Sequence, residues 1–262
     1  MTIAPLAAAG AEETYGGKAA ALARAIGAAL PVPDGFAVGW ETVSRAANGD
    51  AEAQRAIVDA FRAHPAANVA VRSSAVGEDS LDASFAGQHV TVLNVLSDEM
   101  LLDAVRTIHA SARAESALEY RRRMGVTGEP KIAVVVQRLI DADAAGVLFT
   151  RNPMTGADER VIESAWGLGE AVVAGLVTPD RFRIAKTGTI LSRDAGRKDV
   201  RVRRDPNGGV VEQPVPETDI ARLSLNDAQL MELPAANAER AKRRTSSTGS
   251  LARCSRTTNA AS

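Results

Sequence analysis

The sequence predicts an α+β fold, with helices concentrated in the first half of the chain and strands in the second. Apolar side chains recur at helical spacing at Leu101, Val105 and Ile108, whereas short β-branched runs such as residues 132–136 are typical of buried strands. No internal repeat is evident. Helices followed by a group of strands indicate a mixed fold whose helices and sheets are not strictly alternating.

The first half is predicted to alternate helices with short strands. An Ala- and Leu-rich helix follows Lys18, and the prolines and glycine of residues 31–35 stop it. Ser97 is suited to cap a long helix that ends near Gly125, because Asp98 and Glu99 would lie in its first turn. The other predicted elements are helices over 19–30 and 40–63 with a break at 48–49, strands at 36–38, 69–71 and 89–95, and a loop over 73–88.

The second half is predicted to be mostly strands. Residues 131–140 have the composition of a buried strand, and 199–203 alternate in the way expected of an edge ribbon. Further strands are predicted at 146–150, 160–163 and 181–184. Asn226 is placed to cap a last helix.

Composition limits the class of protein. The chain has 262 residues, of which 45% are hydrophobic and 24% charged, as in ordinary globular domains. No apolar run reaches the roughly 20 residues of a membrane span, and no signal peptide is evident. The single cysteine, Cys254, excludes an internal disulfide. A cytoplasmic protein with no membrane or nucleic-acid partner is therefore expected.

The last segment differs in composition from the rest. Residues 234–262 hold six Lys or Arg side chains and one acid, Glu239, and their only large apolar residue is Leu251. Such a segment cannot bury enough apolar surface to offset its ordering entropy, so residues 233–262 are predicted to be a disordered tail. A basic arm for nucleic acid is the alternative, but the segment has no aromatic side chain for base stacking.

Two short motifs carry groups that bind phosphate. Gly16-Gly17-Lys18 precedes a helix, and its glycines would let the backbone approach an anion beside the Lys18 charge. Arg72 follows a short apolar strand and leads into Ser73 and Ser74, which add hydroxyl donors. A turn with a solvated lysine, and an Arg72 paired with nearby acids at 78–79, are the alternatives.

Three further features could be functional sites, and each is a weaker signal than the two phosphate-binding motifs. The loop 75–88 could fold over a polyphosphate near Ser84 and Gly87, or be an ordinary surface loop. The Gly167-x-Gly169 pair only half-matches a dinucleotide fingerprint. None of the three histidines, at 64, 89 and 109, lies in a sequence typical of a phosphoryl acceptor, so each is interpreted as structural or exposed.

Taken in order, these segments resemble the N-terminal ATP-binding domain of the phosphoenolpyruvate synthase, pyruvate phosphate dikinase and rifampicin phosphotransferase family. The resemblance covers about residues 1–232. The similar blocks are 16–22, 30–38, 71–79, 83–88, 120–125, 134–140, 146–153, 165–170 and 177–180. It implies an ATP-grasp-like fold of two lobes with the nucleotide between them, and transfer of a phosphoryl group from ATP, with Mg²⁺, to a histidine on a separate domain and then to pyruvate or a related acceptor.

The same resemblance implies a set of nucleotide-binding residues. Lys18 and Arg72 fall on the family's phosphate-contacting lysine and arginine, Gly87 and Thr91 on positions that approach the nucleotide, and Gln137 on the adenine side. The family's metal-ligand strands, its phosphohistidine domain and its acceptor-binding barrel have no counterpart in this sequence. No catalytic histidine or metal ligand is therefore assigned.

Because the sequence lacks these parts of the family, three interpretations of the chain remain open. The first is an ATP-binding domain of a phosphotransferase, with the change of pattern near Leu233 produced by truncation or a frameshift. The second is a degenerate, inactive remnant. The third is an ATP-grasp ligase that forms an acyl phosphate, although blocks 83–88 and 165–170 favour the first.

Overall fold

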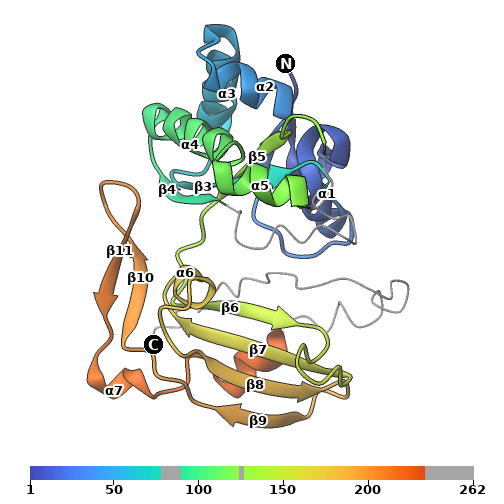
Figure 1. Cartoon of the computed structure of the whole chain (residues 1–262). Coiled ribbons are helices and arrows are strands. Elements are labelled where there is room, and N and C mark those ends of the chain that lie inside the picture. Colours follow the sequence, from blue (N-terminus) through green and yellow to red (C-terminus); the bar gives the residue numbers. More distant parts are fainter. Residues whose placement is uncertain (78–89, 124–126, 234–262) are drawn as a thin grey trace. The chain divides into compact units, whose positions relative to one another are not determined.

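The computed structural model describes residues 1–77, 90–123 and 127–233. The chain divides into two compact units (Figure 1). Of these described residues, the first unit contains those within Met1–Leu139 together with Asp205–Gly209, and the second contains Ile140–Arg204 and those from Val210 to Leu233. Each unit has its own sheet and its own buried cluster, so each is described separately.

The first unit is built on a five-stranded antiparallel sheet in the order β1-β2-β5-β3-β4. The central strands β5 and β3 are rich in valine and almost fully buried, as expected for strands covered on both faces. The strands are β1 (Ile3–Pro5), β2 (Gly35–Val38), β3 (Val69–Ala75), β4 (Thr91–Val95) and β5 (Ile132–Arg138).

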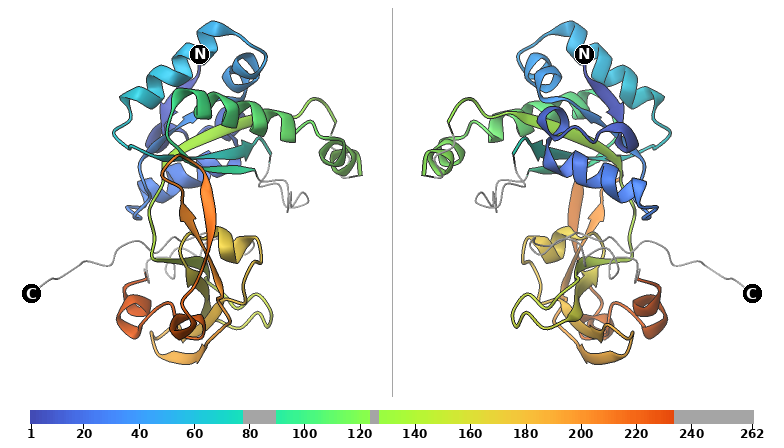
Figure 2. Two further views of the ribbon diagram at one scale, coloured as in Figure 1. Left: turned by 90° about the vertical axis from the view of Figure 1, so that its left-hand side faces the viewer. Right: turned by 90° about the vertical axis from the view of Figure 1, so that its right-hand side faces the viewer.

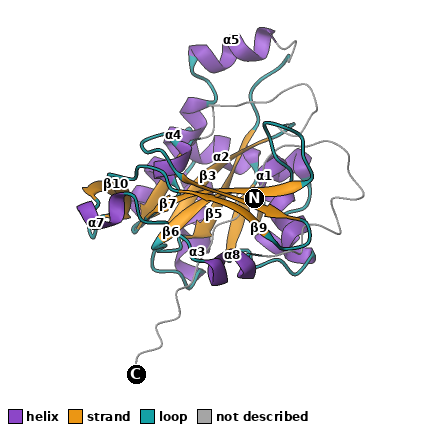
Figure 3. Cartoon of the chain, turned by 90° about the horizontal axis from the view of Figure 1, so that it is seen from below, coloured by secondary structure: helices purple, strands orange, loops and turns teal. Residues whose placement is uncertain are grey.

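Helices cover both faces of this sheet. Helices α2, α3 and α4 bury Val43, Ile57 and Ile108 against one face, while α1 and the 3-10 turn η1 pack on the other. Helix α5 projects away from the sheet (Figure 2 and Figure 3). The bounds are η1 (Leu6–Ala8), α1 (Glu12–Gly27), α2 (Trp40–Ala47), α3 (Ala51–Ala63), α4 (Asp98–Ser111) and α5 (Glu115–Arg123).

The second unit is built on a four-stranded antiparallel sheet in the order β6-β7-β8-β9, with a separate two-stranded ribbon (Figure 1). Phe182 and Ile184 of the sheet pack with Leu230 of the last helix. The elements are β6 (Ala144–Phe149), β7 (Glu159–Trp166), α6 (Glu170–Val173), β8 (Asp180–Ala185), β9 (Ile190–Asp194), β10 (Val200–Arg204), β11 (Val210–Pro214), α7 (Glu217–Ile220) and α8 (Asp227–Glu232).

The α+β prediction is confirmed, and most of its elements are where they were expected. The hydroxyl of Ser97 accepts a hydrogen bond from the Met100 amide and so caps α4. Asn226 forms a capping box with Gln229. Residues 199–203 correspond to β10 of the ribbon, which pairs with β11. These successes depend on local signals, because caps and alternation act within a few residues.

Three expectations are corrected by the structure. The single helix predicted from Ser97 to Gly125 is two helices, because the amides of residues 113 and 114 bond three residues back and tighten the turn after Ser111. The loop predicted to begin at Ser73 begins later, since β3 runs to Ala75. The predicted tail was to begin at Leu233, but Leu233 is buried in the apolar cluster of the second unit. The rest of the predicted tail, 234–262, lies outside the described residues.

Within the residues that the structure describes, no helix is long and apolar enough to cross a membrane.

Candidate functional site

A kink in helix α1 brings the Gly16-Gly17-Lys18 motif against the end of strand β3. Gly16 has φ of 77° and ψ of 168°, which is not helical and is open essentially only to glycine. A Cβ atom built on Gly16 would lie 2.2 Å from the carbonyl oxygen of Ser74. The motif therefore needs glycine at position 16 both for the backbone turn and for the close approach of β3.

Side-chain hydrogen bonds fasten this contact. The Ser74 hydroxyl donates to the carbonyl of Tyr15 at 2.7 Å and accepts from the amide of Ala19 at 3.1 Å. The Lys18 ammonium donates to the carbonyl of Ser73. Two motifs that are more than fifty residues apart in sequence thus form a single junction.

The pairing of strands places the other predicted residues on the same face of the sheet as α1. Arg72 lies directly opposite Thr91 on β4 and opposite Val135 on β5, and Val135 packs with the α1 cluster. Directly opposite residues of an antiparallel pair point to the same face. Lys18, Arg72 and Thr91 are each half-buried. Arg72 and Thr91 are direct neighbours across β3 and β4, and Lys18 of α1 contacts Ser73, the residue after Arg72.

Gln137 lies on the same face but is further along the sheet, opposite Ala70 and Gly35. Its side chain is buried, and its Nε2 donates to the carbonyl of Pro33 at 2.9 Å. The amide group thereby fixes the Pro-rich turn after α1. Its role on the adenine side stays a prediction, while the structural role is visible.

Gly87 and most of the predicted phosphate loop lie outside the described residues, as do the acids at 78–79 proposed as alternative partners of Arg72. Of the three histidines, His89 lies there too. His64 packs at 6.1 Å from the Phe36 ring, with its Nε2 3.3 Å from an Asp34 carboxylate oxygen. Burial lowers the pKa of His109, and the charge of Arg113 lowers it further. Both described histidines have the structural surroundings that were expected.

The turn at Asp34 is held by charge as well. The Arg138 guanidinium donates to both carboxylate oxygens of Asp34, at 2.5 and 2.9 Å. This hydrogen bonding holds the pKa of Asp34 below its usual value, despite partial burial that acts in the opposite direction. Asp34 and Gln137 together fix the chain between α1 and β2.

The Trp166-Gly167-Leu168 segment has a structural role in the second unit. Gly167 has φ of 80°, and a Cβ there would lie 2.4 Å from the carbonyl of Val202. The Leu168 amide donates to that carbonyl at 2.9 Å. The glycine therefore joins the β10–β11 ribbon to the end of β7, which the half-matched fingerprint did not predict.

Sequence reasoning also missed a buried polar network in the second unit. The Asp180 carboxylate accepts from Lys198, from the Gly196 amide and from both the amide and the hydroxyl of Ser224. Asp180 and Lys198 are separated by a strand pair and a turn, and nothing in the sequence marks them as partners. Such a network is recognised only once the fold has closed around it.

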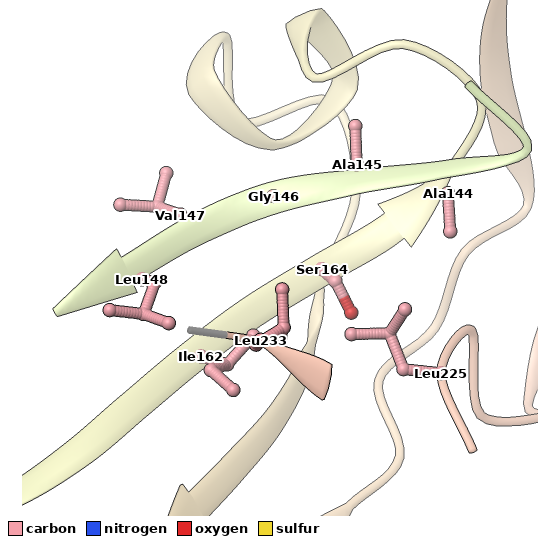
Figure 4. Close-up of a pocket in the computed structure, with 9 residues that line it drawn as sticks. All are labelled: Ala144, Ala145, Gly146, Val147, Leu148, Ile162, Ser164, Leu225 and Leu233. Atoms are coloured by element: carbon pink, nitrogen blue, oxygen red, sulfur yellow. The ribbon is translucent and has the colours of Figure 1, made fainter. Parts of the chain in front are cut away.

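The described residues contain no group of three or more His, Cys, Asp or Glu side chains that could hold a metal ion. A small apolar pocket opens beside β6 (Figure 4), and none of the predicted site residues lines it. Its lining residues are Ala144, Ala145, Gly146, Val147, Leu148, Ile162, Ser164, Leu225 and Leu233.

Comparisons with known proteins identify relatives of the chain. Residues 50–243 match the family described as pyruvate phosphate dikinase, AMP/ATP-binding domain. This range includes Arg72, Thr91 and Gln137 but not Lys18.

Three curated proteins illustrate the similarity. Phosphoenolpyruvate synthase from Aeropyrum pernix is 38% identical over 252 residues, which cover 78% of this chain and 31% of the relative. Prodigiosin synthesizing transferase PigC from Serratia marcescens is 46% identical over 169 residues, covering 64% and 19%. A probable phosphoenolpyruvate synthase from Methanothermobacter thermautotrophicus is 44% identical over 167 residues, covering 63% and 24%. The chain spans less than a third of the length of each of these relatives.

Proposed function

The chain belongs to the pyruvate phosphate dikinase AMP/ATP-binding domain family, and from this premise we propose that it binds ATP for a phosphotransferase. In the proposed reaction a phosphoryl group passes from ATP to a histidine on a separate domain or protein, and from there to pyruvate or a related acceptor. A cytoplasmic location, without membrane or nucleic-acid partners, remains part of this proposal.

One observation carries the proposal. The kinked start of α1, with Lys18, contacts Ser73 and Ser74 of β3, next to Arg72 at the middle of that strand. Arg72 and Thr91 lie directly opposite each other on the sheet face that α1 covers. A helix start offers backbone amides and a partial positive charge, and the two cations add full charges on the same face of the sheet. Phosphoryl transfer depends mainly on positioning and on neutralising charge, so this combination suits a polyphosphate.

Each predicted site residue has a proposed role in binding the nucleotide. Lys18 and Arg72 bind phosphate oxygens, Arg72 through its planar fork. Gly87 and Thr91 approach the nucleotide, and Gln137 lies on the adenine side. The domain is proposed to extend over residues 1–232 together with the buried Leu233, with 234–262 outside it.

Mg²⁺ is expected to accompany ATP. Magnesium in phosphoryl-transfer sites is commonly held by substrate phosphates, water and one or two carboxylates. The described residues contain no group of three or more His, Cys, Asp or Glu side chains that could hold a metal ion, so no protein ligand is proposed for the ion. When bound, the ion would neutralise phosphate charge.

Calorimetric titration with Mg-ATP tests the binding claim. Lys18→Ala and Arg72→Ala are each expected to weaken binding by roughly 10- to 100-fold, the size of one charge-assisted interaction. Arg55→Ala removes an exposed arginine from α3 of the same unit and serves as the control. A folded wild-type chain that gives no ATP heat would contradict the proposal and favour a degenerate remnant.

A second experiment tests the reaction. Labelled ATP is incubated with the chain and a separately expressed histidine domain from a relative. Label on the histidine is the expected result. ATP binding without any transfer, together with formation of an acyl phosphate on a carboxylate substrate, would instead favour an ATP-grasp ligase.

A further inference from the structure

We infer that Ser74 is a positioning residue of the proposed ATP site, where its hydroxyl holds Lys18 in a fixed relation to Arg72. The consequence for ATP rests on the proposed function, but the geometry does not. Ser74 is fully buried at the end of β3, in contact with the kinked start of α1.

The Ser74 hydroxyl occupies the place of a missing helical hydrogen bond. In an unbroken helix the amide of Ala19 would donate to the carbonyl of Tyr15, four residues earlier. The kink at Gly16 interrupts that ladder. The hydroxyl is inserted between the two groups, since it accepts from Ala19 and donates to Tyr15. Insertion of a side chain into the ladder is one of the recognised causes of a helix kink.

This insertion fixes the position of Lys18 relative to β3. Lys18 lies between the kink and Ala19, so its backbone is fixed on both sides by Gly16 packing and by the Ser74 bond. Its ammonium is fixed by the carbonyl of Ser73. The start of α1 therefore cannot shift along β3 without breaking bonds to two consecutive residues of that strand.

Ser74 also sets the spacing to Arg72. The two residues are two positions apart on β3, so they lie on the same face and about 7 Å apart along the strand. Two cations that repel each other need a rigid frame if both are to meet one polyphosphate. A side chain that never touches the ligand can therefore raise the affinity of the site for that ligand, because it holds the binding groups in place beforehand.

A double-mutant cycle separates positioning from general stability. Mg-ATP affinity is measured for wild type, Lys18→Ala, Ser74→Ala and the double variant. If Ser74 acts through Lys18, Ser74→Ala weakens binding roughly tenfold, and the double variant binds within about twofold of Lys18→Ala alone. Effects that multiply would overturn the inference. Should Ser74→Ala not fold, Ser74→Cys, which keeps the size but hydrogen-bonds weakly, enters the same cycle.

Thr42→Ala is the matched control. Thr42 is also a buried hydroxyl of the first unit, and it accepts a single bond from the Thr2 amide at 3.0 Å. Its loss removes a comparable interaction away from the kink. It is expected to leave the affinity for Mg-ATP within about twofold of wild type, and an equal weakening in both variants would count against a specific role of Ser74.

Amide hydrogen exchange gives a readout that does not involve ATP. Ser74→Ala is expected to speed exchange at Ala19 by roughly tenfold and to leave α3 unchanged. If wild type binds no Mg-ATP, the proposed function fails while this measurement still decides the geometric inference. Unchanged exchange at Ala19 would overturn the inference even if wild type binds ATP.

Discussion

The ammonium group of Lys198 lies 2.5 Å from a carboxylate oxygen of Asp180, and both side chains are completely buried. The other oxygen of Asp180 accepts from the amide and the hydroxyl of Ser224, at 2.6 and 2.7 Å. Every oxygen of this carboxylate is therefore satisfied, as a buried charge requires. The pair joins the start of β8 to two loops of the second unit.

Lys198→Met is predicted to destabilise the second unit strongly. The substitution leaves the Asp180 carboxylate buried with no cation, and removing one partner of a buried pair costs about 3–5 kcal/mol. Arg193→Met is the control, because the Arg193–Asp227 pair is exposed and such pairs contribute about 0–1 kcal/mol. Urea unfolding followed by circular dichroism measures both. A loss below about 1 kcal/mol in Lys198→Met would show that the pair is not needed.

Gly16→Ala is predicted to cost more stability than substitution at other glycines, because it combines two penalties. The backbone dihedral angles of Gly16 lie in a region nearly restricted to glycine, and placing another residue there costs about 1–3 kcal/mol of stability. In addition, the new methyl group would clash with the Ser74 carbonyl.

Two other glycines separate these penalties. Gly49 has φ of 91° but open space around its Cβ position, so Gly49→Ala reports the backbone term alone. Gly10 has neither feature, and Gly10→Ala is expected to be nearly neutral. Thermal unfolding should rank the losses as 16 above 49 above 10. Equal losses at 16 and 49 would mean that β3 moves aside.

The fold could be predicted where local signals fix it. The cap at Ser97, the proline-rich stop after α1 and the valine run of β5 each act within a few residues. Strand order could not be predicted, because β5 lies between β2 and β3 through pairs of residues that are 57 to 102 positions apart in sequence. Strands without a strong apolar pattern, such as β9 and β11, were not predicted, because their pairing partners and not their own sequences make them strands.

The candidate site could likewise be predicted only in part. Lys18 and Arg72 were identified from their chemistry and from the family resemblance, and the structure brings their segments together. Ser74 was noted only as an extra hydroxyl beside Arg72. Its insertion into the helical ladder depends on a kink of particular dihedral angles, and no spacing in the sequence encodes that angle.

His109→Leu is predicted to reduce the dependence of stability on pH between about 7 and 5. Burial and Arg113 lower the pKa of His109 in the folded state, and Glu129 opposes them. The unfolded chain therefore binds more protons as pH falls below the ordinary histidine value near 6.5, and wild-type stability falls through that window until the folded pKa is passed. Urea midpoints at pH 7, 6 and 5 measure the effect. Parallel curves for wild type and His109→Leu would contradict it.

Glu159→Gln is predicted to lower stability most at neutral pH. Arg183 donates to both oxygens of the Glu159 carboxylate, at 3.0 and 2.9 Å, and Asn152 donates at 2.6 Å. The Arg183 hydrogen bonds, followed by the Asn152 bond, hold the pKa of Glu159 below its ordinary value of 4.5. The carboxylate therefore contributes stability that is fully present above the unfolded pKa and is lost as pH falls through the folded pKa.

The difference in unfolding free energy between wild type and Glu159→Gln should accordingly shrink in acid. Below the folded pKa the wild-type carboxyl is itself protonated, so both proteins present a neutral group to Arg183. Urea titrations from pH 7 to pH 2 measure this convergence. Glu212→Gln, at an exposed position of β11, should differ from wild type by no more than about 0.5 kcal/mol at any pH. A constant gap for Glu159→Gln over the whole range would mean that shape, and not charge, holds Arg183 and Asn152 in place.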